Sequence, residues 1–507
     1  MNDNKRIAIN TAAIYFRLIL TVGITLFSTR YVLEALGAVD FGLYNVIAGV
    51  VALFSFIAGT MATTTQRFIS FTMGLTHSVE KIKEVFGSSL LLHLIVAAIV
   101  AIVVLLGGWL IIDQLLEIPP GKYDDAYFVL ISVACGLLGT IISVPFEAVL
   151  MAHENIIFVS ACQVSNAVIK LGGAYLLLFL DIDRLRVYAV IMACLPLLLL
   201  LMEGSFCLKK YQETHLQRKD LKTGPIMREI GKFASWVMIG TTCGTLRTQG
   251  VSILLNMFWG VIVNAANGVA MQVNSTLMFF SASITTSIRP QLVKSAGEND
   301  VARMNTLIIA CCKYPLLLIA LFGVPLIVGM PLVLSIWLTE VPDYTVIFCR
   351  LLIISTLFNQ ATIGLTAGME ACGKVKWVHL LVGLSFLLVL PAGYILAKGG
   401  CPPQGLLWCI VANEAFASIL RILLAWKTIN LDIRSFTKDV IVRCFSVIAL
   451  LLIATYFIWG SLPSSFPWFM VLCLIDIALF GIFTVTIGLT CHERNRILVA
   501  IKSKIKI

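Results

Sequence analysis

Charged residues are scarce in this chain. Only 13% of its 507 residues are Asp, Glu, Lys or Arg, whereas 59% are hydrophobic and the mean hydropathy is +0.97. A soluble domain has about 25% charged residues, so the composition excludes a soluble globular protein. Apolar runs recur along the whole chain, and each approaches the ~20 residues that a helix needs to cross a bilayer. The sequence therefore predicts an all-α polytopic membrane protein.

The motifs of metal binding and catalysis are also lacking. The 14 cysteines include no CxxC pair and no Cys/His cluster with metal-ligand spacing, so we interpret most of them as buried thiols. No Ser/His/Asp, Walker or zinc pattern is present. A DxD at 181–183 lies in a short connection, and we interpret it as a solvated turn. We therefore expect no metal, no cofactor and no catalysis.

The apolar runs predict about fourteen transmembrane helices. They lie at about 8–31, 41–64, 86–112, 127–150, 156–180, 186–207, 233–257, 264–287, 305–337, 344–368, 377–397, 404–426, 442–461 and 466–490. The first run is too long for the apolar region of a cleaved signal peptide, so we interpret it as a retained anchor. An even number of spans places both ends of the chain on one side of the membrane.

Basic residues identify that side. The loops assigned to the cytoplasm hold most of them, including seven between Lys209 and Lys232. The opposite loops hold only Lys122, Arg184, Arg186 and Lys398, with Arg30 at their edge. This bias predicts that both termini are cytoplasmic. It also accounts for the formal charge of +10 as a topology signal, so we exclude nucleic acid as a partner.

The spans group into two lobes and an addition. Residues 1–207 are predicted to form an N-terminal six-helix lobe, 208–232 a cytoplasmic linker loop, 233–430 a second six-helix lobe, and 431–507 two further helices with a basic cytoplasmic tail. A weak repeat supports two pseudo-symmetric lobes. At an offset of 222 residues, Asn45, Thr63, Thr64 and Arg67 align with Asn267, Thr285, Thr286 and Arg289. Parallel repeats of this kind are a known transporter plan.

Three basic residues lie too deep in their spans to reach the membrane surface. An arginine at the centre of a membrane helix costs roughly 2.5–3.5 kcal/mol on insertion scales. Arg17, Lys170 and Arg247 are in this position. We interpret them as lining a water-filled functional cavity, with a buried ion pair as the alternative. For Arg30 and Arg350, snorkelling to the interface is a plausible alternative.

Other polar residues follow the same helices. The small and hydroxyl-bearing positions are equally explained by helix packing. The candidate cavity-lining residues are Asn45, Thr63, Asn166, Asn267, Asn274 and Thr285. Arg67 and Arg289 are assigned to the cytoplasmic mouth of the cavity.

The charged residues deep within the predicted spans are mainly basic. The acids of the first lobe, Glu34, Glu147 and Glu203, are placed towards helix ends, and the deep acids are Glu414 and Asp476. Glu414 shares a helix face with Arg421, which makes an ion pair between them one interpretation. Coupling to Na⁺ or H⁺ through Glu414 or Asp476 is the other. The result is a cationic interior suited to an anionic substrate, since arginine binds phosphate oxygens bidentately.

The stretch RYVLEALGAVDFGLYNVIAGVVALFSFIAGTMATTTQRFIS at 30–70 resembles the polysaccharide-transport branch of the multidrug/oligosaccharidyl-lipid/polysaccharide exporter superfamily. Its most family-like element is LGAVDFGLYN at 36–45. This resemblance implies two six-helix lobes around an alternately opening cavity, in the bacterial cytoplasmic (inner) membrane. It further implies an oligosaccharide repeat unit on undecaprenyl diphosphate as substrate, membrane lipid around the tail, and polysaccharide polymerase and ligase machinery as partners. Arg17, Lys170 and Arg247 fit headgroup binding by position.

Three alternatives remain. A cation-coupled drug exporter of the same superfamily shares this plan, although the first span here carries an arginine and no carboxylate. A polyprenyl-linked glycosyl-transfer enzyme commonly needs a sizeable non-cytoplasmic loop, and the longest here is about 113–126. A non-transporting scaffold would not need a cationic cavity.

Overall fold

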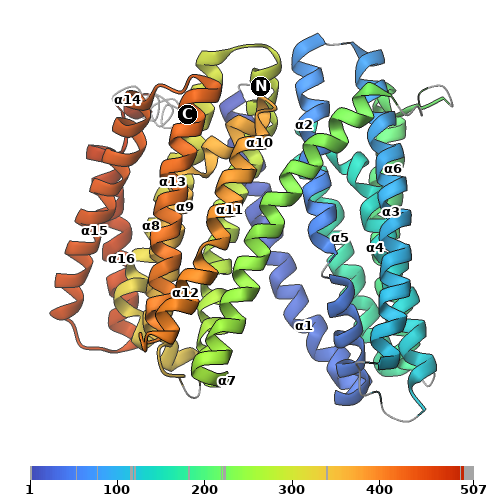
Figure 1. Cartoon of the computed structure of the whole chain (residues 1–507), viewed down its shortest axis with the longest axis horizontal. Helices are drawn as coiled ribbons and strands as arrows, with labels where there is room; N and C mark the ends of the chain where they lie inside the picture. Colours follow the sequence, from blue (N-terminus) through green and yellow to red (C-terminus); the bar gives the residue numbers. More distant parts are fainter. Residues whose placement is uncertain are drawn as a thin grey trace, which may run out of the picture. The chain divides into compact units, whose positions relative to one another are not determined.

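A computed structural model describes residues 3–52, 54–76, 78–114, 118, 121–180, 183–217, 220, 224–338, 341–490 and 493–495. Asp181 and Ile182 of the DxD lie outside these ranges, as does most of the basic C-terminal tail. Within them the structure is helical and contains no strand (Figure 1), so the predicted all-α class is confirmed.

The α-helices are α1 (Asp3–Ala52), α2 (Ser55–Thr76), α3 (Val79–Gln114), α4 (Tyr123–Ala152), α5 (Ile156–Leu176), α6 (Arg184–Lys210), α7 (Pro225–Gly297), α8 (Val301–Trp337), α9 (Thr345–Ala371), α10 (Val375–Trp377), α11 (Gly383–Leu387), α12 (Val389–Lys398), α13 (Gln404–Ile429), α14 (Ile433–Phe436), α15 (Arg443–Gly460) and α16 (Phe466–Phe483). Short 3₁₀ segments are η1 (Leu177–Phe179) and η2 (Gln212–Thr214), and π segments are η4 (Val378–Val382), η5 (Thr437–Val442) and η6 (Thr484–Gly488).

The chain divides into two compact units. Unit 1 comprises residues 1–238 and 293–299, and unit 2 comprises 239–292 and 300–507. In unit 1, α4 packs against α1, α2, α3, α5 and α6. In unit 2, α9 packs between α8 and α13, and α15 and α16 both pack against α8. The most enclosed helices of the two units are therefore α4 and α9, and both carry residues of the cavities described below.

The two longest helices each bend sharply at one glycine. Gly37 in α1 has φ 74° and ψ 172°, and Gly260 in α7 has φ 84° and ψ −177°. This region of backbone conformation is essentially restricted to glycine. The two bends lie 223 positions apart, close to the offset of the sequence repeat. Each bend thus follows the first helix of its predicted lobe.

The bends reconcile the helix count with the predicted spans. Among the described residues, ten helices are long and apolar enough to cross a membrane by themselves. The four remaining predicted spans correspond to the first arm of α1, its second arm with α2, and the two arms of α7. About fourteen spans are consistent with this arrangement.

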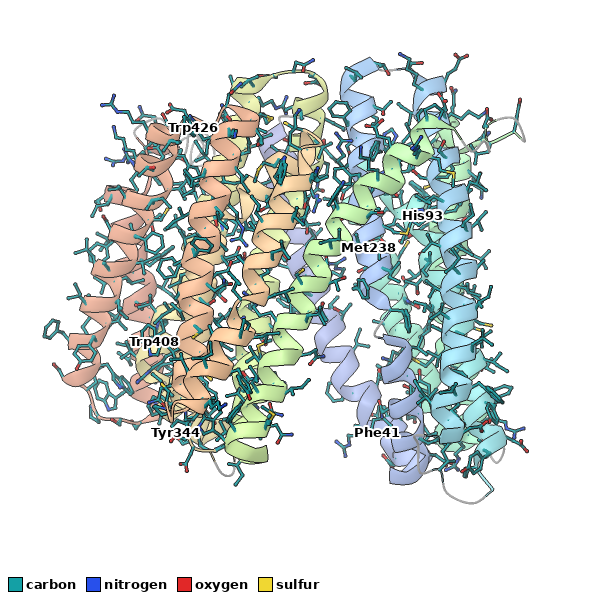
Figure 2. All side chains as sticks on the ribbon, in the orientation of Figure 1. Phe41, His93, Met238, Tyr344, Trp408 and Trp426 are labelled. Carbon is teal, nitrogen blue, oxygen red and sulfur yellow. The ribbon has the colours of Figure 1, made fainter. Side chains whose placement is uncertain are left out.

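Aromatic side chains indicate the thickness of the apolar zone in unit 2. Trp408 and Trp426 are both more than half exposed and lie towards opposite ends of α13 (Figure 2). At 1.5 Å per residue they are about 27 Å apart along the helix. This distance is close to the ~30 Å of a bilayer's hydrocarbon core, and tryptophan is enriched at both interfaces.

Basic residues of the predicted non-cytoplasmic loops of unit 1 have structural partners. The Lys122 ammonium contacts Asp40 at 3.0 Å and Asp125 at 3.3 Å, and the Asp40 carboxylate raises the pKa of Lys122. Arg184 donates to the Ala35 carbonyl at 3.1 Å. That carbonyl lies just before the bend at Gly37, where the helix cannot supply its usual partner. These contacts fasten the bend of α1 to α4 and α6.

We predict that Gly260→Ala destabilises the protein by about 1–3 kcal/mol, because an alanine side chain disfavours this backbone conformation. Thermal unfolding of the purified chain would measure the change. Gly268→Ala is the matched control, because Gly268 is an ordinary helical residue of α7 and a methyl group there meets open space. Equal melting temperatures for the two variants would contradict the prediction.

Candidate functional site

A polar cavity lies within unit 2, among both arms of α7 and helices α9 and α13. Its volume is about 150 Å³. Because α7 folds back at Gly260, its two arms place residues far apart in the sequence on one wall. The lining residues are Arg247, Thr248, Val251, Asn267, Met271, Asn274, Met278, Leu352, Ser355, Thr356, Asn359, Ile410 and Glu414.

Glu414 is the acidic residue among the lining residues of this cavity. Its carboxylate accepts hydrogen bonds from Arg247 at 3.1 Å, Arg421 at 2.9 Å and the Asn359 amide at 2.7 Å. The carboxylate side chain is only 2% exposed, and the Arg421 side chain is 4% exposed. The predicted pairing of Glu414 with Arg421 is therefore confirmed, and Arg247 is a second partner that the sequence analysis did not identify.

This network leaves a surplus of positive charge at the cavity. Two guanidinium groups share one carboxylate, and the Arg247 side chain remains 20% exposed. The Arg247 guanidinium also lies 4.1 Å from the centroid of the Phe386 ring, a favourable cation–π contact. The buried Arg421 thus neutralises Glu414, whereas the partly exposed Arg247 can offer N–H donors to a ligand in the cavity.

Amide and hydroxyl groups complete the wall. Asn267 is 5% exposed and lines the cavity. Asn274 accepts a hydrogen bond from the Thr356 hydroxyl. Among the residues predicted to line a cavity, Asn267 and Asn274 therefore lie beside Arg247, while Thr285 on the same helix is half-buried and outside this wall.

A second cavity, of about 370 Å³, lies within unit 1. Its walls come from α2, α4, α5 and α6 and include Thr140, Ser143, Glu147, Gln163 and Glu203. The Arg17 guanidinium donates to the Gln163 amide oxygen at 2.6 Å, which places the predicted arginine directly behind this wall. The Arg17 charge also interacts electrostatically with the Glu147 carboxyl.

The two acids of this cavity, Glu147 and Glu203, lie towards the C-terminal ends of α4 and α6, as predicted, but the sequence did not place them at a cavity. Glu203 is 2% exposed and has no hydrogen-bond partner among the residues that the structure describes. A signal was available: Thr140, Ser143 and Glu147 recur at i, i+3 and i+7 and so share a helix face. These two carboxyl groups are the functional candidates that sequence reasoning missed.

The remaining predicted residues of unit 1 are dispersed. Lys170 is half-buried on α5 and has no ion-pair partner among the described residues. Asn166, one turn earlier, has a buried side-chain oxygen without a hydrogen-bond partner in the described part of the chain. Arg30 and Asn45 are exposed, and the Thr63 hydroxyl donates to the Thr60 carbonyl at 2.9 Å.

The residues assigned to the cavity mouth and to ion coupling have local partners. Arg67 is buried among the rings of Phe68, Phe71 and Phe233. Arg289 donates to Glu370, whose carboxylate also lies 3.2 Å from the His379 ring. Asp476 is 1% exposed and accepts from the Thr455 hydroxyl.

Two candidates of unit 2 lie away from the cavity of Arg247. Asp476 lies between α15 and α16 and does not contribute to that wall. Arg350 lines a separate hollow formed with α8 and α15.

We predict that Arg421→Ala destabilises the protein more than Arg247→Ala. Removing one partner of a buried ion pair costs about 3–5 kcal/mol because the other charge stays uncompensated. The Arg247 side chain is more exposed, so its loss leaves Glu414 with Arg421 and Asn359. Thermal unfolding of the two variants would test this order, and a lower melting temperature for Arg247→Ala would refute it.

Comparison with solved structures reveals the same fold in other proteins. A multidrug resistance MATE family transporter of the MOP superfamily, in its outward-facing conformation, is 13% identical over 85% of this chain and 96% of its own, with a TM-score of 0.68. The Vibrio cholerae MATE transporter VcmN in its bent form is 17% identical over 85% and 97%, with a TM-score of 0.67. A MOP superfamily transporter from Pyrococcus furiosus is 14% identical over 86% and 97%, with a TM-score of 0.68.

No protein-family model and no curated protein sequence matches the chain. The likeness is therefore one of structure, and it extends over nearly the whole length of each neighbour. The chain has the two-lobe fold of the MATE membrane transporters of the MOP superfamily.

Proposed function

We propose that the chain is a flippase, which translocates undecaprenyl-diphosphate-linked oligosaccharide repeat units across the bacterial cytoplasmic membrane by alternating access. The transporter fold supports the general class. The observation that carries the choice of substrate is the surplus positive charge of the network at this cavity, in which Arg247 and Glu414 line the wall and the buried Arg421 pairs with Glu414 behind it. Such a wall favours an anionic ligand over a lipophilic cation.

The ion pairs are arranged so that Arg247 can leave Glu414 and bind a ligand. When Arg247 turns from Glu414 towards a diphosphate, the carboxylate keeps Arg421 at 2.9 Å and Asn359 at 2.7 Å. No buried charge is then left uncompensated, so the main cost of breaking a buried pair is avoided. The guanidinium gains the bidentate geometry that phosphate oxygens favour.

The remaining polar side chains of the cavity are suited to a sugar. Asn267, Asn274 and Ser355 offer amide and hydroxyl groups that can both donate and accept hydrogen bonds. Lys170 and Arg17 of unit 1 are further cationic candidates for the diphosphate. The polyprenyl tail would stay in membrane lipid, because an apolar chain gains nothing from a polar cavity.

Structural neighbours of this fold differ in the polarity of their pockets. For the Pyrococcus furiosus transporter, a reversed polarity of the binding pocket suggests a different function. The fold therefore does not determine whether the substrate is an anion or a cation; the side chains that line the cavity do. For this chain, the side chains of unit 2 support an anion.

We predict that Arg247→Gln lowers transport of the lipid-linked repeat unit at least about tenfold, because a hydrogen bond between charged groups contributes about 1.5–3 kcal/mol. In the native cell, the intact undecaprenyl-diphosphate oligosaccharide should accumulate and surface polysaccharide should fall, as measured by mass spectrometry of extracted lipids. Arg228→Gln is the matched control, since Arg228 is an exposed arginine outside both cavities. Normal transport by Arg247→Gln at a normal protein level would overturn the headgroup assignment.

A cation-coupled multidrug exporter is the second candidate function. The observation that favours it is the cavity of unit 1, where Glu147 and Glu203 face a hollow also lined by Gln163, Thr140 and Ser143. Carboxyl, amide and hydroxyl oxygens are suitable ligands for a proton or a hard cation. One of the structural neighbours is a multidrug resistance transporter.

We predict that Glu203→Gln abolishes the dependence of transport on an imposed Na⁺ or H⁺ gradient while leaving the protein folded, because the amide removes the charge but keeps the shape. Proteoliposomes with and without each gradient would measure this for the lipid-linked oligosaccharide and for a cationic dye. Dye efflux that follows the gradient, with no movement of the oligosaccharide, would favour the exporter. Gradient dependence unchanged in Glu203→Gln would remove this acid from coupling.

A further inference from the structure

An apolar hollow in unit 2 contains a single charged residue. It measures about 650 Å³ and lies among α8, α9 and α15. Its walls are aliphatic and aromatic side chains, apart from the guanidinium of Arg350. The lining residues are Ile327, Val328, Pro331, Arg350, Leu452, Ile453, Tyr456, Phe457 and Trp459.

The position of Arg350 is fixed by a proline of the neighbouring helix. Pro331 has no backbone N–H, so the carbonyl four residues earlier, that of Ile327, loses its usual helical partner. The Arg350 Nε donates to this carbonyl at 2.8 Å. A buried carbonyl without a donor is costly in a membrane, and the arginine supplies that donor. The contact holds the guanidinium at the wall of the hollow by its Nε and leaves both Nη groups for another partner.

No carboxylate within the described residues pairs with Arg350. An arginine exposed to hydrocarbon is unfavourable unless it finds a counter-charge or reaches the headgroup region. The hollow itself offers none, because its other residues are apolar or aromatic. Among the described residues Arg350 thus has no anionic partner, so its guanidinium is open to an anion from outside the protein.

The hollow lies at one end of unit 2, where a headgroup would be. Arg350 is in the second turn of α9 and Trp459 is in the last turn of α15. The start of α9 and the end of α15 lie at the same end of unit 2 (Figure 1). Tyr344, just before α9, lies at that end in Figure 2. Tyrosine and tryptophan are enriched at the membrane interface. An arginine at this level can meet a lipid phosphate while an acyl chain lies against the aromatic wall.

The hollow is separate from the cavity of Arg247. On α9, the cavity is lined by Leu352, Ser355, Thr356 and Asn359. At 100° per residue, Arg350 lies on roughly the opposite face of the helix from these residues. A ligand at Arg350 therefore does not compete with a substrate beside Arg247.

We propose that this hollow is a binding site for an anionic glycerophospholipid, with its phosphate on the two Nη groups of Arg350 and one acyl chain against Tyr456, Phe457 and Trp459. The planar guanidinium binds two phosphate oxygens at once, and the apolar wall buries the chain. The site goes beyond the proposed transport function, since it uses neither cavity.

Brominated lipids quench nearby tryptophan fluorescence, which makes Trp459 a reporter for the site. The full-length protein would be placed in phosphatidylcholine vesicles with increasing amounts of brominated phosphatidylglycerol, or of brominated phosphatidylcholine as the neutral comparison. Subtracting the signal of a Trp459→Phe variant isolates this residue from the other tryptophans. We expect half-maximal quenching at a roughly tenfold lower fraction of the anionic lipid than of the neutral lipid.

Arg350→Gln should abolish this preference, and Arg350→Lys should weaken it, because lysine keeps the charge but not the fork of donors. Arg350→Lys keeps the test decisive if Arg350→Gln does not fold. Lys398→Gln, which removes an exposed charge at the end of α12, should leave the preference unchanged.

Three results would overturn the proposal. The first is equal quenching by both brominated lipids, and the second is an unchanged preference in both Arg350 variants. The third is displacement of the brominated lipid by undecaprenyl diphosphate far more readily than by unlabelled phosphatidylglycerol, which would assign the hollow to the tail of a transported lipid. Because binding alone is measured, none of these results depends on whether the chain is a flippase.

Discussion

A charge inside a bilayer needs a partner, and this requirement decides how the helices of unit 2 meet. Glu414 of α13 accepts hydrogen bonds from Arg247 of α7 and Asn359 of α9, as well as from Arg421 of its own helix. Separating α7 from α13 in the absence of a ligand would leave the Arg247 guanidinium without its counter-charge in a medium of low polarity, which is unfavourable. The same contacts that hold the helices together therefore also set the charge of the cavity wall.

The same requirement separates structural charges from candidate functional charges. Lys313 is completely buried and is matched by Glu493 at 2.6 Å, and Arg289 is matched by Glu370. These pairs are satisfied within the protein. Glu203, Lys170 and Arg350 have no such counter-charge among the described residues, although each lies within a helix of the membrane protein. An ionisable group that the fold does not pair must either lose its charge or be stabilised by water, an ion or a ligand, which makes these three residues candidates for function.

Hydropathy was sufficient to predict the helical class and about fourteen spans, because a lipid-exposed backbone has no alternative to a helix. The side-chain contacts between helices were harder to predict from the sequence. Glu414 and Arg421 are seven positions apart on one helix and could be paired from the sequence, whereas Arg247 and Glu414 are separated by 167 positions. Their meeting depends on helix packing, which no local pattern encodes. The contact between Arg350 and the Ile327 carbonyl is similar, although Pro331 marks in advance which carbonyl lacks a donor.

The two units share a bent first helix but differ in the charges of their cavities. Gly37 and Gly260 occupy equivalent places with the same glycine-restricted backbone. In unit 2 the cavity is lined by Arg247 and Glu414, with Arg421 paired to Glu414 behind the wall, while the cavity of unit 1 is lined by two carboxyl groups with one arginine behind Gln163. Packing constraints would preserve the bends in both halves, since any other residue there is strained. They do not require different charge patterns, and this difference agrees with the separate tasks proposed above, anion binding in unit 2 and cation or proton binding in unit 1.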